Sequence, residues 1–291
     1  MGSAEPAAMA GQEAVGRVVK AAGGVGSVLA NMLGATLRAG WHSGALRPGD
    51  VLPPLWHWAA FPQDTPMEGI GPDGHPALGA FLPDLGLGRR MWAGGKLRFL
   101  RPLHVGERLT RRSEIIGVDW KKAGAMAIVS LVHRIEGESG PAIEEDQQIV
   151  YLPIPDAYRP PARQPAPQEA AFDETVEAGP VRLFRYSAAT FNGHRIHYDR
   201  AYATEVEHYP GLIVHGPLQA TLLIERAVAH RGGAHPVSLS HRGVHPMFAH
   251  QPLRLIGADE GAAMALCTAT RAEDGGHQGM QVRAEWDAAA A

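Results

Sequence analysis

Polar residues capable of acid–base chemistry gather in the run TFNGHRIHYD, residues 190–199. His194 and His197 carry imidazoles, whose unperturbed pKa near 6.5 lets them take and release protons at neutral pH. The run follows a strand-like segment, so its side chains would be held at the mouth of a strand, where sites are often found. The alternative is a turn in which Asn192 and His194 bind their own backbone.

A second cluster is His215, Gly216 and Pro217, which follow an apolar run and precede a helical pattern. Proline is favourable in the first helical turn, where its missing N–H would have had no partner. The Gly216 amide would then lie at the positive end of the helix, where it suits a developing oxyanion such as a thioester enolate. The alternative is a tight entry into the helix with no chemical role.

Other chemistries lack their motifs. His194 and His197 are three apart in a predicted turn with no thiol or carboxylate cluster beside them, so we expect no metal site. The glycine-rich run at 23–28 does not follow a strand, which argues against a dinucleotide cofactor, and no GxSxG elbow is present. Cys267 is the only cysteine, so there is no internal disulfide. We expect no cofactor.

Composition indicates a globular protein. The 291 residues are 45% hydrophobic and 20% charged with a formal net charge of −3, and lysine and arginine are scattered, which argues against nucleic acid as a partner. No apolar stretch is long enough to span a membrane and no basic signal segment opens the chain. A cytoplasmic location is therefore expected.

The spacing of apolar residues predicts the elements that must position these clusters. Alternating patterns predict an antiparallel meander within residues 96–152 and further strands at 181–190 and within 235–288. Residues 217–230 form the clearest amphipathic helix, and two short helices are expected within 12–38. The Gly- and Pro-rich stretch 69–88 predicts an ordered loop with a binding role.

The chain divides into two similar halves. Residues 98–109 resemble 242–253, which is consistent with two copies of one sheet-plus-helix unit. Six prolines in 153–170 indicate an extended linker. The predicted organisation is 1–152, a leader and amino-terminal domain, then the linker 153–170, and a carboxy-terminal domain over 171–291.

The segment SAATFNGHRIHYDRAYA followed by YPGLIVHGPL resembles the signature of the MaoC-like hydratase/dehydratase family. In the first half LPPLWHWAAF, PDGHP, RRMWAGGKLRF and RPLHVGERL resemble the subgroup of mesaconyl-C4-CoA and itaconyl-CoA hydratases and mitochondrial-type 3-hydroxyacyl-thioester dehydratases. The resemblance covers about residues 45–285. It implies an α+β double hotdog fold, with two tandem antiparallel sheets each wrapped around a central helix.

The resemblance also implies reversible syn addition of water across the C2–C3 double bond of an acyl thioester, by an Asp–His pair. His197 matches the family histidine, but Asn192 stands where the family has aspartate. An amide cannot carry a proton near pH 7, although it can orient a water. His197 would then be the only proton carrier, Asn192 would position the water, and the Gly216 amide would stabilise the thioester oxygen.

The remaining roles follow from the same resemblance. His194, His215 and Pro217 are expected to contact the substrate, a thioester of coenzyme A or acyl carrier protein. The amino-terminal half would shape the tunnel for the acyl group and coenzyme A. There Arg89, Arg90 and Lys96 could bind phosphates and Trp92 could stack, although solvated surface charge is the alternative. A homodimer stays open as the assembly.

Two further functions are compatible with these residues. Hotdog folds also host thioesterases, which would release free thiol without change at C2–C3. The missing carboxylate at position 192 is also compatible with a non-catalytic subunit that binds acyl thioesters.

Overall fold

The computed structural model describes residues 10–37 and 44–287, so the leader, residues 1–9, lies outside the described part. Its helices are α2 (Ser27–Leu37), α3 (Pro180–Thr190) and α4 (Gly216–His230), with short helical turns η1 (Gln12–Ala14), η2 (Trp56–Ala59), η3 (Met67–Gly69), η4 (Lys122–Gly124), η5 (Arg195–His197) and η6 (Tyr202–Val206). Its strands are β1 (Val18–Gly23), β2 (Arg89–Phe99), β3 (Leu109–Lys121), β4 (Met126–Gly137), β5 (Gly140–Leu152), β6 (Phe172–Val176), β7 (Ser238–Gly243), β8 (Leu253–Glu260), β9 (Ala263–Ala269) and β10 (Gln278–Glu285).

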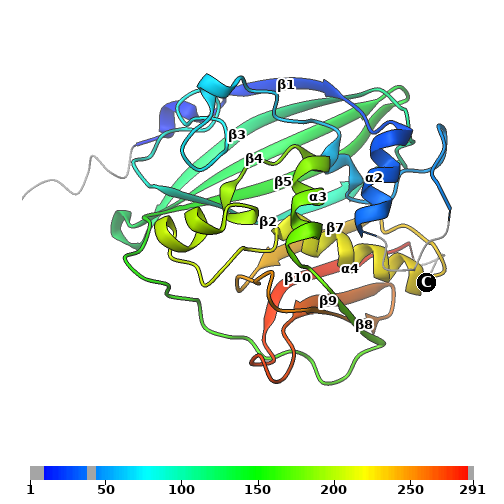
Figure 1. The fold of residues 1–291 in the computed structure, drawn as a ribbon. Coiled ribbons are helices and arrows are strands. Elements are labelled where there is room, and N and C mark those ends of the chain that lie inside the picture. Colours follow the sequence, from blue (N-terminus) through cyan, green and yellow to red (C-terminus); the bar gives the residue numbers. More distant parts are fainter. Residues whose placement is uncertain (1–9, 38–43, 288–291) are drawn as a thin grey trace, which may run out of the picture.

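The strands form one antiparallel sheet in the order β1-β3-β4-β5-β2-β7-β10-β9-β8-β6. Figure 1 shows the three helices against one side of this curved sheet. The first five strands come from the amino-terminal half and the last five from the carboxy-terminal half. The halves meet where β2 pairs with β7, from Gly94 opposite Arg242 to Arg98 opposite Ser238. The meander predicted for the first half is confirmed, with β2 paired to β5.

The two halves repeat one order of elements. Each begins with an edge strand and a helix, β1–α2 and β6–α3, and continues into four strands of the sheet. Isolated bridges occupy equivalent places in the two halves. Val51 pairs with His104 just before η2, and Ile213 pairs with Phe248 just before α4. His104 and Phe248, one residue of each bridge, lie in the stretches whose likeness predicted a repeat.

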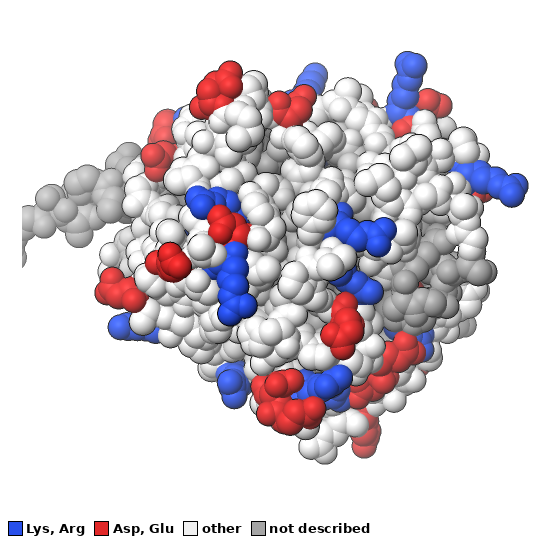
Figure 2. Space-filling view, in the orientation of Figure 1, with Lys and Arg blue, Asp and Glu red and all other residues white. Residues whose placement is uncertain are grey.

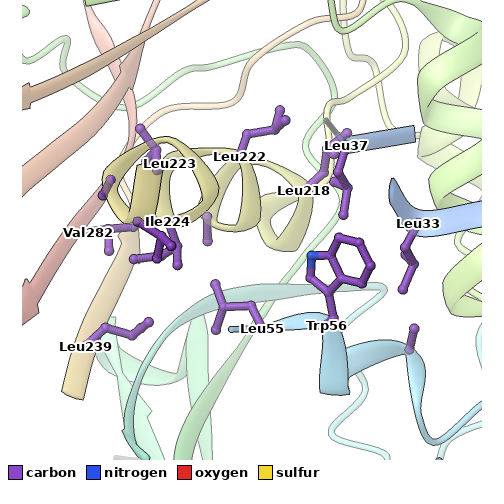
Figure 3. Close-up of a cluster of buried hydrophobic side chains, with 14 of the residues drawn as sticks. Leu33, Leu37, Leu55, Trp56, Leu218, Leu222, Leu223, Ile224, Leu239 and Val282 are labelled. Atoms are coloured by element: carbon purple, nitrogen blue, oxygen red, sulfur yellow. The ribbon is translucent and has the colours of Figure 1, made fainter. Parts of the chain in front are cut away.

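The halves differ at their centres. The carboxy-terminal half has the full helix α4, whereas the corresponding segment of the amino-terminal half has only η2, after which the chain enters a long loop. The indole N–H of Trp56 in η2 donates to Glu225 in α4, at 2.6 Å. Figure 3 shows Trp56 in one apolar cluster with Leu218 of α4 and Leu33 of α2. One core thus serves both halves.

Two predicted elements are wrong. The segment expected to hold two helices forms β1 and α2, because residues 18–23 pair with β3 from Val18 opposite Glu114 to Gly23 opposite Leu109. Residues 181–190, predicted as a strand, are helix α3. Val181 and Phe184 are 73% and 64% exposed, and these surface apolar residues give the false alternation.

The other segments agree with the sequence. Residues 69–88 form a loop with one short bridge, and 153–170 run extended without a helix. Each described helix is too short or too polar to cross a lipid bilayer. On the face drawn in Figure 2, basic and acidic side chains of the described residues are interspersed. The domain boundaries stay a prediction, since the sheet runs through both halves.

Candidate active site

His197 lies in η5 and is fixed by the strand-like segment before α4. Its Nδ1 donates to the carbonyl of Ile213 at 2.8 Å, and the ring is 7% exposed. Because a carbonyl can only accept, Nδ1 carries the proton and Nε2 is the basic nitrogen. The ring therefore offers an acceptor to a water or hydroxyl.

The ring of His215 lies directly against that of His197. The centroids are 3.6 Å apart with 20° between the planes, and His215 is fully buried. Its Nε2 is hydrogen-bonded to Ser187 Oγ at 2.8 Å, and Tyr186 packs edge-on against it. His215 thus packs flat against His197, and its expected contact with substrate stays a prediction.

Burial governs the charge of these two rings. Burial, together with the nearby His194, lowers the pKa of His197 to about 3. Burial likewise lowers the pKa of His215 well below its usual value, with His197 as a further cause. A charged imidazole loses its hydration inside the protein, so the neutral form is favoured. Both rings are neutral at pH 7.

Asn192 forms the turn that leads out of α3. Its Oδ1 accepts from the backbone N–H of His194 at 3.0 Å, and its own N–H donates to Ser187 at 2.8 Å. The turn considered as an alternative is therefore present, and it uses the carbonyl side of the amide. The NH₂ group is the part left to donate to a water or hydroxyl.

His194 joins the motif to the loop 69–88. Its ring is buried, edge-on to His197 at 5.3 Å and against His75 at 4.5 Å, with Nε2 3.6 Å from Glu207 Oε1. The backbone N–H of Arg195 donates to Asp73 O at 2.9 Å. The loop of the amino-terminal half thus packs on the motif of the other half.

Asp73, His75 and His194 place one ligand atom each within 4.8 Å of one another. Arg90 already donates to both carboxylate oxygens of Asp73, at 2.9 and 3.1 Å. A carboxylate engaged in this way is a poor donor to a metal ion, so the cluster fits a hydrogen-bonded wall between the halves.

Gly216 is the first residue of α4 and Pro217 the second. The first amides of a helix have no acceptor within it and lie at the positive end of the dipole. A Cβ atom at position 216 would lie 2.7 Å from Trp92 Cε3 and 3.3 Å from Met280 Cε. Glycine is therefore needed here, and Trp92 is brought to the same place. Since His215 precedes Gly216, the helix start and the His197 ring adjoin.

The arginines expected to bind phosphates are engaged elsewhere. Arg89 donates to the side chain and the carbonyl of Glu207 at 3.0 and 2.9 Å, and Arg90 pairs with Asp73. Their side chains are only 10% and 9% exposed. Lys96 is exposed on β2. Phosphate binding by these residues stays a prediction.

Ser187, His75, His241 and Trp58 also belong to this region and were missed in the sequence. Ser187 lies in α3, which was predicted as a strand, and the other three come near the motif only through folding. Two cavities, of about 410 and 510 Å³, are lined by residues near Arg101 and near Lys96, and neither includes His197 or Gly216. The candidate active site is therefore identified by the chemistry of its side chains and not by the volume of these cavities.

A family model described as hydroxyacyl-thioester dehydratase type 2 matches residues 55–249. The chain belongs to this family. Among curated proteins, a mesaconyl-C(4)-CoA hydratase of Chloroflexus aurantiacus is 41% identical over 225 residues, covering 75% of this chain and 79% of the relative. The mitochondrial hydroxyacyl-thioester dehydratase type 2 of Schizosaccharomyces pombe is 29% identical over 244 residues, covering 72% and 79%.

The solved structures support the fold expected for a hydroxyacyl-thioester dehydratase type 2. A Mycobacterium tuberculosis protein with a double hotdog fold superposes with a TM-score of 0.59 at 13% identity, covering 93% of this chain and 95% of that one. The expected double hotdog is confirmed. The amino-terminal half keeps only η2 where a central helix was expected.

Proposed function

We propose that this chain catalyses the reversible syn addition of water to the C2–C3 double bond of a short 2-enoyl-CoA. The observation that carries the proposal is the neutral His197 ring. One of its nitrogens is held by Ile213 O, the other is free to accept a proton, and the ring adjoins the first amide of α4 through His215. Family membership supports the same reaction class.

In the hydration direction, Nε2 of His197 takes a proton from water while the water oxygen bonds to C3. The electron pair of the double bond moves toward the thioester carbonyl, which becomes an enolate oxygen. The enolate then collapses, and the imidazolium returns the proton to C2 on the same face. One water is added and the enzyme is restored; dehydration reverses each step.

Three interactions make these steps feasible for a histidine of low pKa. The enolate is negatively charged, and an opposite charge nearby raises the pKa of His197 just as it takes its proton. The Gly216 amide would donate to the enolate oxygen, a contribution of about 3 to 4 kcal/mol for one such donor. Asn192 would donate its NH₂ to the water or the 3-hydroxyl.

The test is hydration of a four-carbon 2-enoyl-CoA, followed by loss of the conjugated absorbance. We expect His197→Ala to fold and to lose at least ~100-fold in rate. His104→Ala removes a half-exposed histidine from the loop between β2 and β3 and should leave the rate unchanged. Free thiol with an intact C2–C3 bond would instead identify a thioesterase. Tight binding without turnover, unaltered in His197→Ala, would identify a binding subunit.

The acyl group, the carrier and the assembly are further parts of the proposal. A panel of enoyl-CoA esters with and without a free carboxylate would test whether this chain shares the type of substrate named for the Chloroflexus relative. Acyl carrier protein thioesters belong in the same panel. A homodimer and a cytoplasmic location stay predictions, testable by sedimentation and by cell fractionation.

A further inference from the structure

A tryptophan of the amino-terminal half closes the start of α4. Trp92 lies on β2, and its Cε3 and Cζ3 atoms would be 2.7 and 2.9 Å from a Cβ at position 216. Glycine at 216 is what lets the indole come so near. The ring is half-buried. A thioester whose carbonyl reaches the Gly216 amide would therefore meet this indole.

Two further rings hold Trp92 in this position. His241 of β7 is stacked on it, with centroids 4.1 Å apart and 10° between the planes. Trp58 of η2 meets Trp92 edge-on at 5.5 Å and His241 edge-on at 6.0 Å. The three rings come from three separate elements and from both halves, so Trp92 cannot turn away without breaking contacts on two sides.

A buried carboxylate anchors the group of rings. The indole N–H of Trp58 donates to both oxygens of Glu145, at 3.1 and 3.2 Å, and His57 Nε2 lies 3.5 Å from the same carboxylate. Burial alone would raise the pKa of Glu145, but the hydrogen bond from His57 and the nearby histidines lower it to about 2. The anchor is thus charged at neutral pH.

Gly95 leaves the space that the ring of His241 occupies. A Cβ at Gly95 would lie 2.8 Å from His241 Nε2, so His241 fits only because its cross-strand neighbour has no side chain. Both ring nitrogens of His241 are buried without a partner among the described residues. Burying two ring nitrogens without hydrogen-bond partners costs free energy. The favourable contact that this ring makes is its stacking on Trp92.

We propose that Trp92, held by Trp58 and His241, forms the wall that limits the acyl group to a short chain. The proposal rests on the proposed function, because it takes the thioester carbonyl to lie at Gly216. It differs from the expected stacking on coenzyme A, since an indole braced on two sides beside the reacting atoms faces the acyl group. Trp92 is then a specificity residue for the proposed reaction.

The experiment compares 2-enoyl-CoA esters of four to ten carbons in the wild type, Trp92→Ala and Trp120→Ala. Trp120 packs against a separate apolar cluster, so Trp120→Ala removes an equal ring away from the site. We expect the wild-type kcat/KM to fall at least tenfold, roughly, from four to eight carbons. Trp92→Ala should raise the eight-to-four-carbon ratio by roughly tenfold or more, and Trp120→Ala should leave it unchanged.

Two results would contradict the proposal that Trp92 limits the length of the acyl group. One is a wild type that accepts ten carbons as well as four. The other is a Trp92→Ala variant that loses the same factor with every ester, which would place the indole on the coenzyme side. Trp92→Phe, which keeps a stacked ring, should give an intermediate ratio and guards against misfolding of the alanine variant.

Binding separates this proposal from the reaction itself. Calorimetry with saturated butyryl-CoA and octanoyl-CoA reads the same selectivity without chemistry. The wild type should prefer butyryl-CoA, and Trp92→Ala should remove that preference. A wild type that hydrates no ester contradicts the proposed function, while the binding ratio still decides whether the wall exists.

Discussion

The imidazole of His197 lies face to face with that of His215, with ring centroids 3.6 Å apart. The two rings cannot both be charged at this distance, since like charges in a buried site repel strongly. A neutral His215, held by Ser187 Oγ, gives the proton-carrying ring a flat support while Ile213 O fixes its edge. His197 is therefore restrained in both position and tautomer.

Removing the support should lower turnover more than binding. In Ser187→Ala, His215 loses its hydrogen bond, and we expect kcat to fall roughly tenfold with KM nearly unchanged, because Ser187 would not touch substrate. Steady-state kinetics with a four-carbon enoyl-CoA measures both. Ser238→Ala removes a serine hydroxyl bonded to Glu285 on the sheet and serves as the control. An unchanged kcat in Ser187→Ala would contradict the positioning role.

Gly216 and Trp92 should be coupled. Gly216→Ala keeps the backbone amide but forces a Cβ within 2.7 Å of Trp92, so kcat/KM should fall on the order of 10- to 100-fold. Adding Trp92→Ala removes the clash and should recover most of that loss. A double-mutant cycle measures the coupling. Losses that simply multiply would show that the glycine serves another purpose.

Asn192 has two separable tasks, the turn and the donor. Asn192→Asp keeps an oxygen to accept from the His194 N–H, so thermal stability should be retained, whereas Asn192→Ala should cost about 1 kcal/mol of unfolding free energy. Asn192→Ala also loses the NH₂ group and should lose activity if that group positions the water, whereas Asn192→Asp puts the carboxylate of the family's Asp–His pair in its place and should retain activity. Unfolding curves and hydration rates, measured side by side, separate the tasks. Equal stability in all three proteins would contradict the role in the turn.

Acid should destabilise the fold through its buried histidines. Burial lowers the pKa of His197 to about 3 and that of His241 to about 4, and it lowers those of His75 and His215 well below the usual value. Below pH 6.5 the unfolded chain binds protons that the folded protein does not. The free energy of unfolding therefore decreases as the pH is lowered. Each such histidine contributes about 1.4 kcal/mol between pH 7.5 and 5.5.

Urea unfolding at pH 7.5 and 5.5 checks this slope. His241→Phe keeps a stacked ring but removes one buried imidazole. Its unfolding should therefore take up about one proton fewer than that of the wild type, so its free energy of unfolding should change less with pH. His104→Ala, which removes a half-exposed histidine, should keep the wild-type slope. Identical stability at both pH values would show that these rings take up protons without unfolding.

Local pattern predicted much of the fold and the centre of the site. Alternation found the strands β2 to β5 and β7 to β10 but not the edge strands β1 and β6, and 3.6-residue periodicity with Pro217 found α4. The pairing of the 192–197 run with His215–Gly216 came from the family resemblance. Helix α3 was missed because exposed Phe184 imitates a strand alternation, and Ser187 was missed with it.

The contributions of the other half had no local signal. Trp92, Trp58 and His241 lie on different elements and meet only because β2 pairs with β7 and η2 replaces a full helix. The two arginines looked like anion ligands in the sequence, but acidic partners 17 and 118 positions away occupy them. Such partnerships follow from topology, which single-sequence patterns do not contain.

Because β2 pairs with β7 and both halves share one core, we expect the halves to stay together without the peptide connection between them. Proteolytic nicking within residues 153–170 would leave two fragments clamped edge to edge over a common core. Expressed separately, neither fragment would bury its exposed edge, so each should be unstable alone and the pair should reassemble on mixing.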